Sequence, residues 1–283
     1  MTVAGFVLAA GLGTRISVLS VRVPKPLLPV GDTTPLAAAF ARLWDAGART
    51  IVANAAHLPE QVAAAGLQLG IEVVVERDGP LGTAGGLAHA RSALGSGPVL
   101  IWNGDVVADL DPAPLVPAGL ELARLAVRDV GAAGTGNVGL DAEGRVVRLR
   151  KQSFGVEARG AHYAAVMGLS PEGVRGAPTR GCLVGDLLIP ALAAGADVRA
   201  VVTTGLWHDI GDLASYFAAN LARPYVSPIA RVTPGIDVRR VVLGDEALVG
   251  GYGLLDEVVA WPKARLMAPL RRAIVTPDQV LEV

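Results

Sequence analysis

Over the first 222 residues, short apolar runs rich in β-branched residues alternate with Ala-rich stretches whose apolar positions recur at helical spacing. The apolar runs predict strands at residues 5–10, 50–54, 71–76 and 98–102. The helical stretches cover residues 35–46, 60–67, 82–93 and 213–222. Continuously apolar strands separated by helices are typical of a mostly parallel sheet that is covered on both faces. The pattern therefore predicts an α/β fold, with a Rossmann-like sheet flanked by helices.

A different pattern begins after Pro224 and Pro228. From there, apolar residues recur every six positions, at Ile236, Val242, Leu248, Leu254, Ala260 and Leu266. Neither a helix nor a simple strand has this period, whereas the hexapeptide repeat of a parallel β-helix does. A pair of antiparallel hairpins is the alternative. We expect two domains, residues 1–224 and a short left-handed β-helix tail at residues 228–283. About two coils are too few to be stable alone, so the tail should pack on the first domain or on a second subunit.

Composition narrows the function classes. The 283 residues include 25 basic and 26 acidic side chains, a net charge of -1, so bulk charge indicates neither a nucleic-acid nor a membrane-surface partner. The longest apolar run, residues 3–13, is shorter than the ~18 residues that a membrane span needs. A single cysteine, Cys182, excludes an internal disulfide. We expect a reduced, cytoplasmic protein that holds any anion in a local site.

A candidate anion site follows the first predicted strand. Residues 11–15 read Gly-Leu-Gly-Thr-Arg, and a strand that enters a Gly-rich turn can point backbone N–H groups at a phosphate. The third glycine of the Rossmann fingerprint is replaced by Ile16, and no Gly-Lys-Ser/Thr follows, so a plain turn remains an alternative. Lys25 lies between two prolines in a chain with three lysines and 22 arginines. That placement favours a rigidly held ammonium group over an ordinary surface lysine.

Residues 8–30, LAAGLGTRISVLSVRVPKPLLPV, resemble the signature LAAGxGTRLxPLTxxxPKPLLPV of the sugar-1-phosphate nucleotidylyltransferases. All spacings are kept, and the departures are Ile16, Val18 and Ser20. The resemblance implies that Arg15 neutralises charge on the leaving pyrophosphate and that Lys25 holds the reacting phosphates. It also implies a loop around the nucleotide phosphates that consists of Ala9, Ala10, Gly11, Leu12, Gly13 and Thr14.

Two aspartates stand where metal ligands are expected. Asp105 ends the buried strand in LIWNGD, at the carboxyl end where open α/β sheets bind ligands, and Asp209 lies in LWHDIGD. By resemblance to family motifs, both would bind Mg²⁺, a cation that prefers carboxylate oxygens. The alternative is that Asp105 caps a turn and Asp209 a helix. The neighbouring Asp212 is the expected cap of the helix at residues 213–222.

Base and sugar contacts follow from weaker resemblances. Residues 79–87, GPLGTAGGL, resemble the family segment PLGTAGAL that closes over the nucleobase. This implies contacts from Gly82, Thr83, Gly85 and Gly86. Asn137 and Lys151 would contact the sugar phosphate, because residues 143–151 resemble a family hairpin in which a lysine does so. Here Arg150 replaces the preceding acidic residue and Gln152 the following proline.

These features predict an enzyme that converts a nucleoside triphosphate and a sugar-1-phosphate into a nucleoside-diphosphate sugar and pyrophosphate. The transfer would be in line, Mg²⁺-dependent and without a covalent intermediate. A hexose-1-phosphate is slightly favoured. N-acetylmuramate-1-phosphate uridylyl transfer and heptose-1-phosphate guanylyl transfer are alternatives, as is a non-catalytic subunit that binds nucleotide sugars. Neither the base nor the sugar can be read from the residues, and edge pairing of the tail strands would allow a homo-oligomer.

Overall fold

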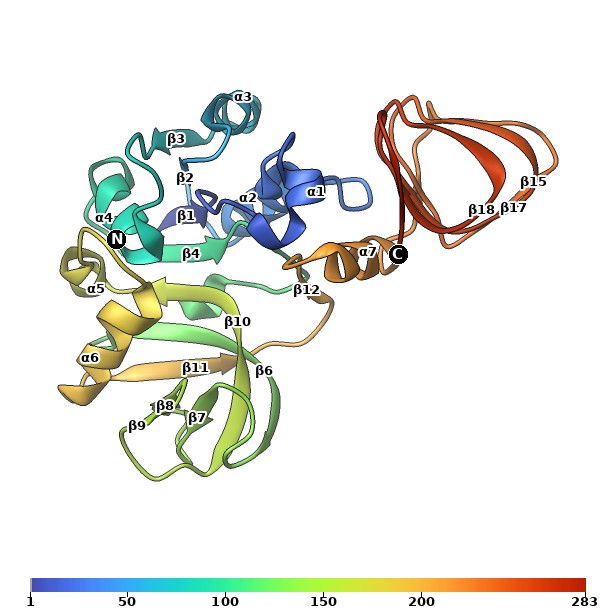
Figure 1. Ribbon diagram of the computed structural model, residues 1–283. Helices are drawn as coiled ribbons and strands as arrows, with labels where there is room; N and C mark the ends of the chain where they lie inside the picture. The colour runs from blue at the N-terminus through green and yellow to red at the C-terminus, as the bar shows by residue number, and fades with distance from the viewer. Residues whose placement is uncertain (1) are drawn as a thin grey trace.

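The computed structural model describes residues 2–283, and its larger part is a mixed sheet flanked by helices (Figure 1). Four strands form the parallel half in the order β3-β2-β1-β4. They are β1 (Ala4–Leu8), β2 (Thr50–Ala55), β3 (Glu72–Val75) and β4 (Val99–Asn103). This half confirms the four strands predicted from the apolar runs, and it brings the carboxyl ends of β1 and β4 side by side.

The second half of the sheet is largely antiparallel. The long strand β10 (Arg159–Leu169) joins the edge of β4 in the opposite direction and also pairs with β6 (Ala123–Ala132). β6 in turn pairs with β11 (Val198–Val202) in parallel. A meander of short strands extends the sheet: β7 (Val138–Leu140), β8 (Val146–Leu149) and β9 (Gln152–Ser153). This antiparallel half of the sheet lies beside β4, the edge strand of the parallel half (Figure 1).

Helices cover the faces of the sheet: α2 (Pro35–Asp45), α3 (Pro59–Leu69), α4 (Gly82–Leu94), α5 (Pro171–Gly176) and α6 (Ile189–Ala193). The helices α1 (Ser17–Ser20) and α7 (Leu213–Leu221) pack instead in the apolar cluster that includes residues of the tail. Thr34 caps α2 by accepting a hydrogen bond from the Ala37 N–H, and Asp212 and Ser215 form a capping box on α7. The prediction that Asp212 is a helix cap is therefore confirmed. In residues 2–283, no helix is long and apolar enough to cross a membrane.

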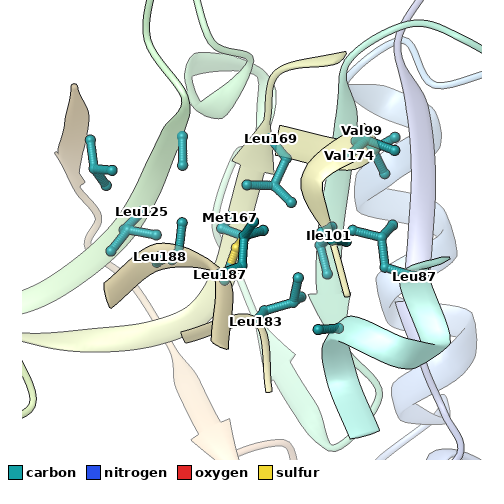
Figure 2. Packing of buried hydrophobic residues seen from close by; sticks show 14 of the residues in the cluster. Leu87, Val99, Ile101, Leu125, Met167, Leu169, Val174, Leu183, Leu187 and Leu188 are labelled. Carbon is teal, nitrogen blue, oxygen red and sulfur yellow. The ribbon is translucent and has the colours of Figure 1, made fainter. Parts of the chain in front are cut away.

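A continuous apolar core lies on each face of the sheet. On one face, Leu87 of α4 packs with Val99 and Ile101 of β4 and with Met167 and Leu169 of β10 (Figure 2). On the other face, α2 and α3 pack against β1, β2 and the fully buried Trp102. Because helices cover both faces of the parallel half, this half of the sheet offers its strand ends for a site.

The C-terminal segment forms a parallel β-helix, drawn as the coil in orange and red in Figure 1. Its strands are β13 (Tyr225–Val226), β14 (Arg231–Val232), β15 (Ile236–Arg239), β16 (Val242–Leu243), β17 (Leu248–Ala260), β18 (Arg265–Val275) and the antiparallel β19 (Val280–Glu282). Val242 pairs with Val259, and Leu248 with Arg265, so the coil returns after 17 residues. The predicted parallel β-helix is confirmed, and its left-handed sense stays a prediction.

Three members of the six-residue pattern are displaced by one position in the coil, whereas Ile236, Ala260 and Leu266 pack in or against its interior as predicted. The interior contains Leu243, Val249, Leu255, Ala260 and Leu266, whereas Leu248 and Leu254 are only partly buried. Val242 points instead toward α7 and joins the core that the tail shares with the rest of the chain. The sequence pattern could not separate the two series, because adjacent positions are both apolar and the coil is one residue short of three hexapeptides.

The tail is attached to the larger part by a shared buried cluster. Tyr216 and Phe217 of α7 pack with Val259, Trp261 and Ile274 of the tail. The buried Tyr216 hydroxyl donates to the Pro29 carbonyl at 2.6 Å and accepts from Trp261 Nε1 at 2.8 Å. The tail therefore makes a hydrogen-bonded connection through α7 to the segment that follows Lys25.

We expect Tyr216→Phe to destabilise the protein by about 1–3 kcal/mol, because it leaves the buried Trp261 N–H without its acceptor. Urea denaturation followed by tryptophan fluorescence measures this. Tyr252→Phe is the matched control, since Tyr252 is 80% exposed. Equal midpoints for the two variants would contradict the prediction.

Candidate active site

Two adjoining cavities open at the carboxyl ends of β1 and β4, and both are lined by Leu8, Thr83 and Asn103. The first has a volume of about 190 Å³, and the rest of its wall consists of Ala10, Gly11, Lys25, Pro26, Asn54, Pro80, Gly82, Gly104 and Asp105. The second is larger, about 540 Å³, and lies over the antiparallel half of the sheet. The arrangement offers one pocket for each of two substrates.

Lys25 is buried at the wall of the first cavity. Pro24 precedes it in an extended conformation, and a short 3-10 helix, Lys25–Leu27, holds it in place. Its ammonium group donates to Asp105 Oδ2 at 2.8 Å, and its side chain is only 9% exposed. A buried ammonium needs a partner of opposite charge, and Asp105 supplies it. The sequence-based expectation of a rigidly held lysine is consistent with this geometry.

Asp209 lies next to Asp105 because two short strands pair. β5 (Val106–Ala108) and β12 (Trp207–Asp209) are antiparallel, and the Ile210 N–H donates to the Asp105 carbonyl at 2.9 Å. The Asp209 carboxyl lines the second cavity. Partial desolvation and the neighbouring Asp105 carboxylate raise the pKa of Asp209 above its ordinary value, while Lys25 and Arg15 oppose the shift. The structure thus concentrates negative charge where the two cavities meet.

Arg15 extends from the Gly-rich loop to this charged cluster. A Cβ atom on Gly211 would lie 3.4 Å from Arg15 Nη1, so the guanidinium lies directly over the backbone at Gly211. Its positive charge opposes the rise in the pKa of Asp209, and it adds to the lowering of the pKa of Asp212 that hydrogen bonds from Ser215 cause. Four of the predicted residues, Arg15, Lys25, Asp105 and Asp209, therefore converge on one place, although they come from four separate segments.

The predicted phosphate loop contributes only part of its length to the cavity. Ala10 and Gly11 line it, whereas Ala9, Leu12, Gly13 and Thr14 do not. Gly13 has a structural reason to be glycine, since its φ is +64° and a Cβ would lie 2.8 Å from the Ser20 hydroxyl. The buried Ala9 donates its N–H to Asn54 Oδ1 at 2.7 Å.

Only part of the predicted base-binding segment lines a cavity, as is also the case for the phosphate loop. Gly82 and Thr83 line the first cavity, whereas Gly85 and Gly86 are buried inside α4 and line neither cavity. A Cβ on Gly85 would lie 2.8 Å from the Thr179 carbonyl oxygen. These two glycines therefore serve packing within the protein. The resemblance alone could not distinguish them from glycines that face a ligand.

The second cavity includes Asn137 but not Lys151. Asn137 lines it and accepts a hydrogen bond from the Tyr163 N–H at 2.8 Å. Lys151 is exposed outside both cavities, and its neighbour Arg150 lines the second cavity instead, with Nη2 lying 3.2 Å from Cys182 Sγ. The backbone of Arg150 has a φ of +57°, in the left-handed region, so the chain leaves the regular strand geometry at this residue. The side chains of Arg150 and Lys151 therefore do not follow the alternation expected of a strand.

Several lining residues were missed by sequence reasoning. They are Asn54, Arg128, Arg150, Cys182 and Trp207. The Arg128 guanidinium lies over the Trp207 ring, 5.4 Å from its centroid, and donates to the Gly205 carbonyl. The departure at Arg150 from the family hairpin was the one available signal. Trp207 lies in the segment LWHDIGD that also contains Asp209, whereas Asn54, Arg128 and Cys182 lie in segments without a recognisable motif.

The charged cluster suits a divalent cation that is also held by substrate. Residues 2–283 contain no group of three or more His, Cys, Asp or Glu side chains arranged to hold a metal. The two carboxylates of Asp105 and Asp209 nevertheless match Mg²⁺, which keeps several waters and binds one or two carboxylates together with substrate phosphates. Burial and, after it, the neighbouring Asp105 carboxylate raise the pKa of Asp209, and a cation bound by both carboxylates would offset this cost of holding them ionised.

Comparisons with known proteins identify the family and the fold. Residues 5–115 match the family described as the MobA-like NTP transferase domain. The chain is 31% identical to N-acetylmuramate alpha-1-phosphate uridylyltransferase from Caulobacter vibrioides over 231 residues, which cover 75% of the chain and 93% of that protein. It is 27% identical to mannose-1-phosphate guanylyltransferase from Mycobacterium tuberculosis over 297 residues, 93% of the chain and 80% of that protein.

The N-acetylmuramate alpha-1-phosphate uridylyltransferase from Neisseria meningitidis is 41% identical to the chain over 110 residues, and the chain spans 48% of that protein's length. Among solved structures, HddC from Yersinia pseudotuberculosis in complex with GMP-PN has the same fold, with a TM-score of 0.62 at 22% identity over 78% of the chain and 98% of HddC. The fold and the matches define a nucleotidyltransferase. Within that class, the chain belongs to the sugar-1-phosphate nucleotidyltransferase family.

We expect Lys25→Ala to lower kcat/KM for nucleotidyl transfer by about 10²–10³-fold, because it removes a fixed positive charge beside the reacting phosphates. Steady-state release of pyrophosphate measures the change. Lys263→Ala, in an exposed position of the tail, is the matched control and should keep full activity. An active Lys25→Ala enzyme would remove Lys25 from the mechanism.

Proposed function

We propose that this protein transfers a nucleotidyl group from a nucleoside triphosphate to a sugar-1-phosphate and releases pyrophosphate. The observation that carries the proposal is the convergence of Arg15, Lys25, Asp105 and Asp209 at the place where the two adjoining cavities meet. Family membership supports the same reaction class. A non-catalytic subunit would not need this arrangement of charges.

The chemistry then requires positioning and charge stabilisation more than proton transfer. A sugar-1-phosphate is already ionised at neutral pH, so its oxygen can attack the α-phosphorus without a general base. Lys25 would hold the reacting phosphates, and Arg15 would stabilise negative charge on the leaving pyrophosphate. The N–H groups of the loop at Ala10 and Gly11 would cradle the triphosphate. The two cavities keep donor and acceptor adjacent, which contributes by proximity.

We assign Mg²⁺ to Asp105 and Asp209. When bound there, the cation would neutralise charge on the phosphate oxygens as the transfer proceeds. The Lys25 ammonium, hydrogen-bonded to Asp105, orients that carboxylate toward the junction of the cavities. The assignment rests on the pair of carboxylates and on the need of triphosphate chemistry for a divalent cation.

For the sugar, we propose a hexose-1-phosphate in the second cavity, with N-acetylmuramate-1-phosphate and heptose-1-phosphate as the alternative substrates. Relatives with both mannose-1-phosphate and N-acetylmuramate names support a sugar-1-phosphate in general terms. Asn137 and Arg150 would contact the sugar or its phosphate, because both line this cavity. Arg150 takes the role that the sequence had indicated for Lys151.

We also propose that catalysis is confined to residues 1–224 and that residues 228–283 form a separate supporting domain in a cytoplasmic enzyme. Every residue that lines the two cavities lies between Leu8 and Asp209. The tail contributes none of them. Its role is then structural support, and its outer strands provide an edge at which a second copy could pair.

The test is a pyrophosphate-release screen that combines four nucleoside triphosphates with a panel of sugar-1-phosphates in the presence of Mg²⁺. We expect one strongly preferred pair, with activity abolished by EDTA and restored by added Mg²⁺. Asp209→Asn should lower kcat by about 10²-fold or more, because it removes one anionic ligand. Asp111→Asn, in an exposed loop, is the control. No release from any pair, together with binding of a nucleotide sugar, would favour the regulatory subunit.

A second prediction separates the two neighbouring basic residues. Arg150→Ala should raise KM for the sugar-1-phosphate by about tenfold, since it removes a cation from the second cavity. Lys151→Ala, which changes an exposed side chain outside that cavity, should leave KM within about twofold. The opposite ranking in steady-state kinetics would return the sugar-phosphate contact to Lys151.

A further inference from the structure

A buried hydrogen-bonded pair connects the two loops that line the first cavity. Glu76 follows β3 and is 3% exposed, and Asn54 lies in β2 and is 2% exposed. Asn54 Nδ2 donates to Glu76 Oε1 at 2.7 Å. We propose that Glu76 and Asn54 are positioning residues that hold the phosphate loop and the base-binding loop at a fixed separation, and that nucleotide affinity depends on this pair. The inference rests on the proposed function of the first cavity.

Each member of the pair also holds one loop by its backbone. Asn54 Oδ1 accepts from the Ala9 N–H at 2.7 Å, directly before Ala10 and Gly11 of the phosphate loop. Glu76 Oε2 accepts from the Leu81 N–H at 2.7 Å, directly before Gly82 of the base-binding loop. An unbroken chain of three hydrogen bonds therefore runs from one wall of the cavity to the other.

The direction of each hydrogen bond is determined by the chemistry of its partners. A backbone N–H can only donate, so the Asn54 oxygen faces Ala9 and its amide nitrogen faces Glu76. A carboxylate accepts at both oxygens, and Glu76 receives one donor at each. Among residues 2–283, no basic side chain lies within 4.0 Å of the Glu76 carboxylate. Its partners are therefore the two donors that define the loops.

The need for this pair also explains a glycine in α4. A Cβ on Gly86 would lie 2.3 Å from Asn54 Nδ2 and 2.8 Å from Glu76 Oε1. Any larger residue at position 86 would push the two side chains apart. Gly86, which sequence reasoning assigned to the nucleobase, thus makes room for the connection between the loops.

Reversing the donor and the acceptor provides a sharp test. Glu76→Gln places an amide nitrogen against Asn54 Nδ2 or leaves the Leu81 N–H without an acceptor. Asn54→Asp places a second carboxylate against Glu76. The double variant Asn54→Asp/Glu76→Gln restores all three hydrogen bonds, because the new carboxylate accepts from Ala9 and from the new amide, and the net charge is unchanged.

We expect each single variant to raise KM for the nucleoside triphosphate by about tenfold, because a buried polar group loses its partner. The double variant should return to within about twofold of the wild type. KM for the sugar-1-phosphate should stay within about twofold in all three. Kinetics are measured well below the thermal midpoint of each variant, and these midpoints are recorded in parallel. A merely structural role would lower the midpoints but leave the nucleotide KM unchanged, and that result would overturn the proposal.

Two further measurements keep the test decisive. If a single variant does not fold, hydrogen exchange on the wild type replaces it: a non-hydrolysable nucleoside triphosphate should slow exchange at Ala9 and Leu81 together, and protection of only one would overturn the coupling. If the wild type releases no pyrophosphate, the proposed function fails by itself. The dissociation constant of the triphosphate then replaces KM, and unchanged values in both single variants would overturn this inference separately.

Discussion

The need to compensate one buried positive charge organises the catalytic end of this protein. Lys25 is 9% exposed, and its ammonium is stabilised because Asp105 lies 2.8 Å away at the end of β4. That requirement fixes the segment between Pro24 and Pro26 against the sheet. The pairing of β5 with β12 then adds Asp209 beside Asp105. The strand ends and the proline-stiffened backbone thus hold the Lys25 ammonium next to the carboxylates of Asp105 and Asp209. The charged groups are in place before a substrate binds.

A preorganised cluster of charges is useful only if the phosphates arrive at a defined position. Part of the wall of the first cavity is irregular backbone, at Ala10 and Gly11 and directly before α4, and such segments are less restrained by regular hydrogen bonding than strands and helices. Asn54 and Glu76 compensate for this by connecting both loops through the buried interior behind the cavity. The rigid sheet therefore extends, through side chains, to the loop backbones that are proposed to contact the nucleotide.

The parallel strands, the helices α2, α3, α4 and α7 and the β-helix could be predicted from the sequence, because each has a recognisable hydrophobic pattern; the antiparallel half of the sheet and the short helices α1, α5 and α6 were not predicted. The roles of Lys25, Asp105 and Asp209 at one site were implied by the resemblance to family motifs. Other features depend on packing across the chain. Gly86 resembles a ligand-facing glycine, yet its lack of a side chain accommodates Asn54. Which of Arg150 and Lys151 enters a cavity depends on a left-handed backbone conformation at position 150, and no local pattern specifies it.

The tail shows how an element outside the cavities can still support their geometry. Trp261 donates to Tyr216, and Tyr216 donates to the Pro29 carbonyl, four residues after Lys25. At the end of the coil, Gln279 donates to the Val18 carbonyl and Asp278 pairs with Arg22, both close to the Gly-rich loop. The exposed pair contributes little by itself, whereas the buried cluster around Tyr216 is continuous with both parts. Because these contacts hold the chain at Val18 and Arg22 before Lys25 and at Pro29 after it, the β-helix supports the position of Lys25 without lining either cavity.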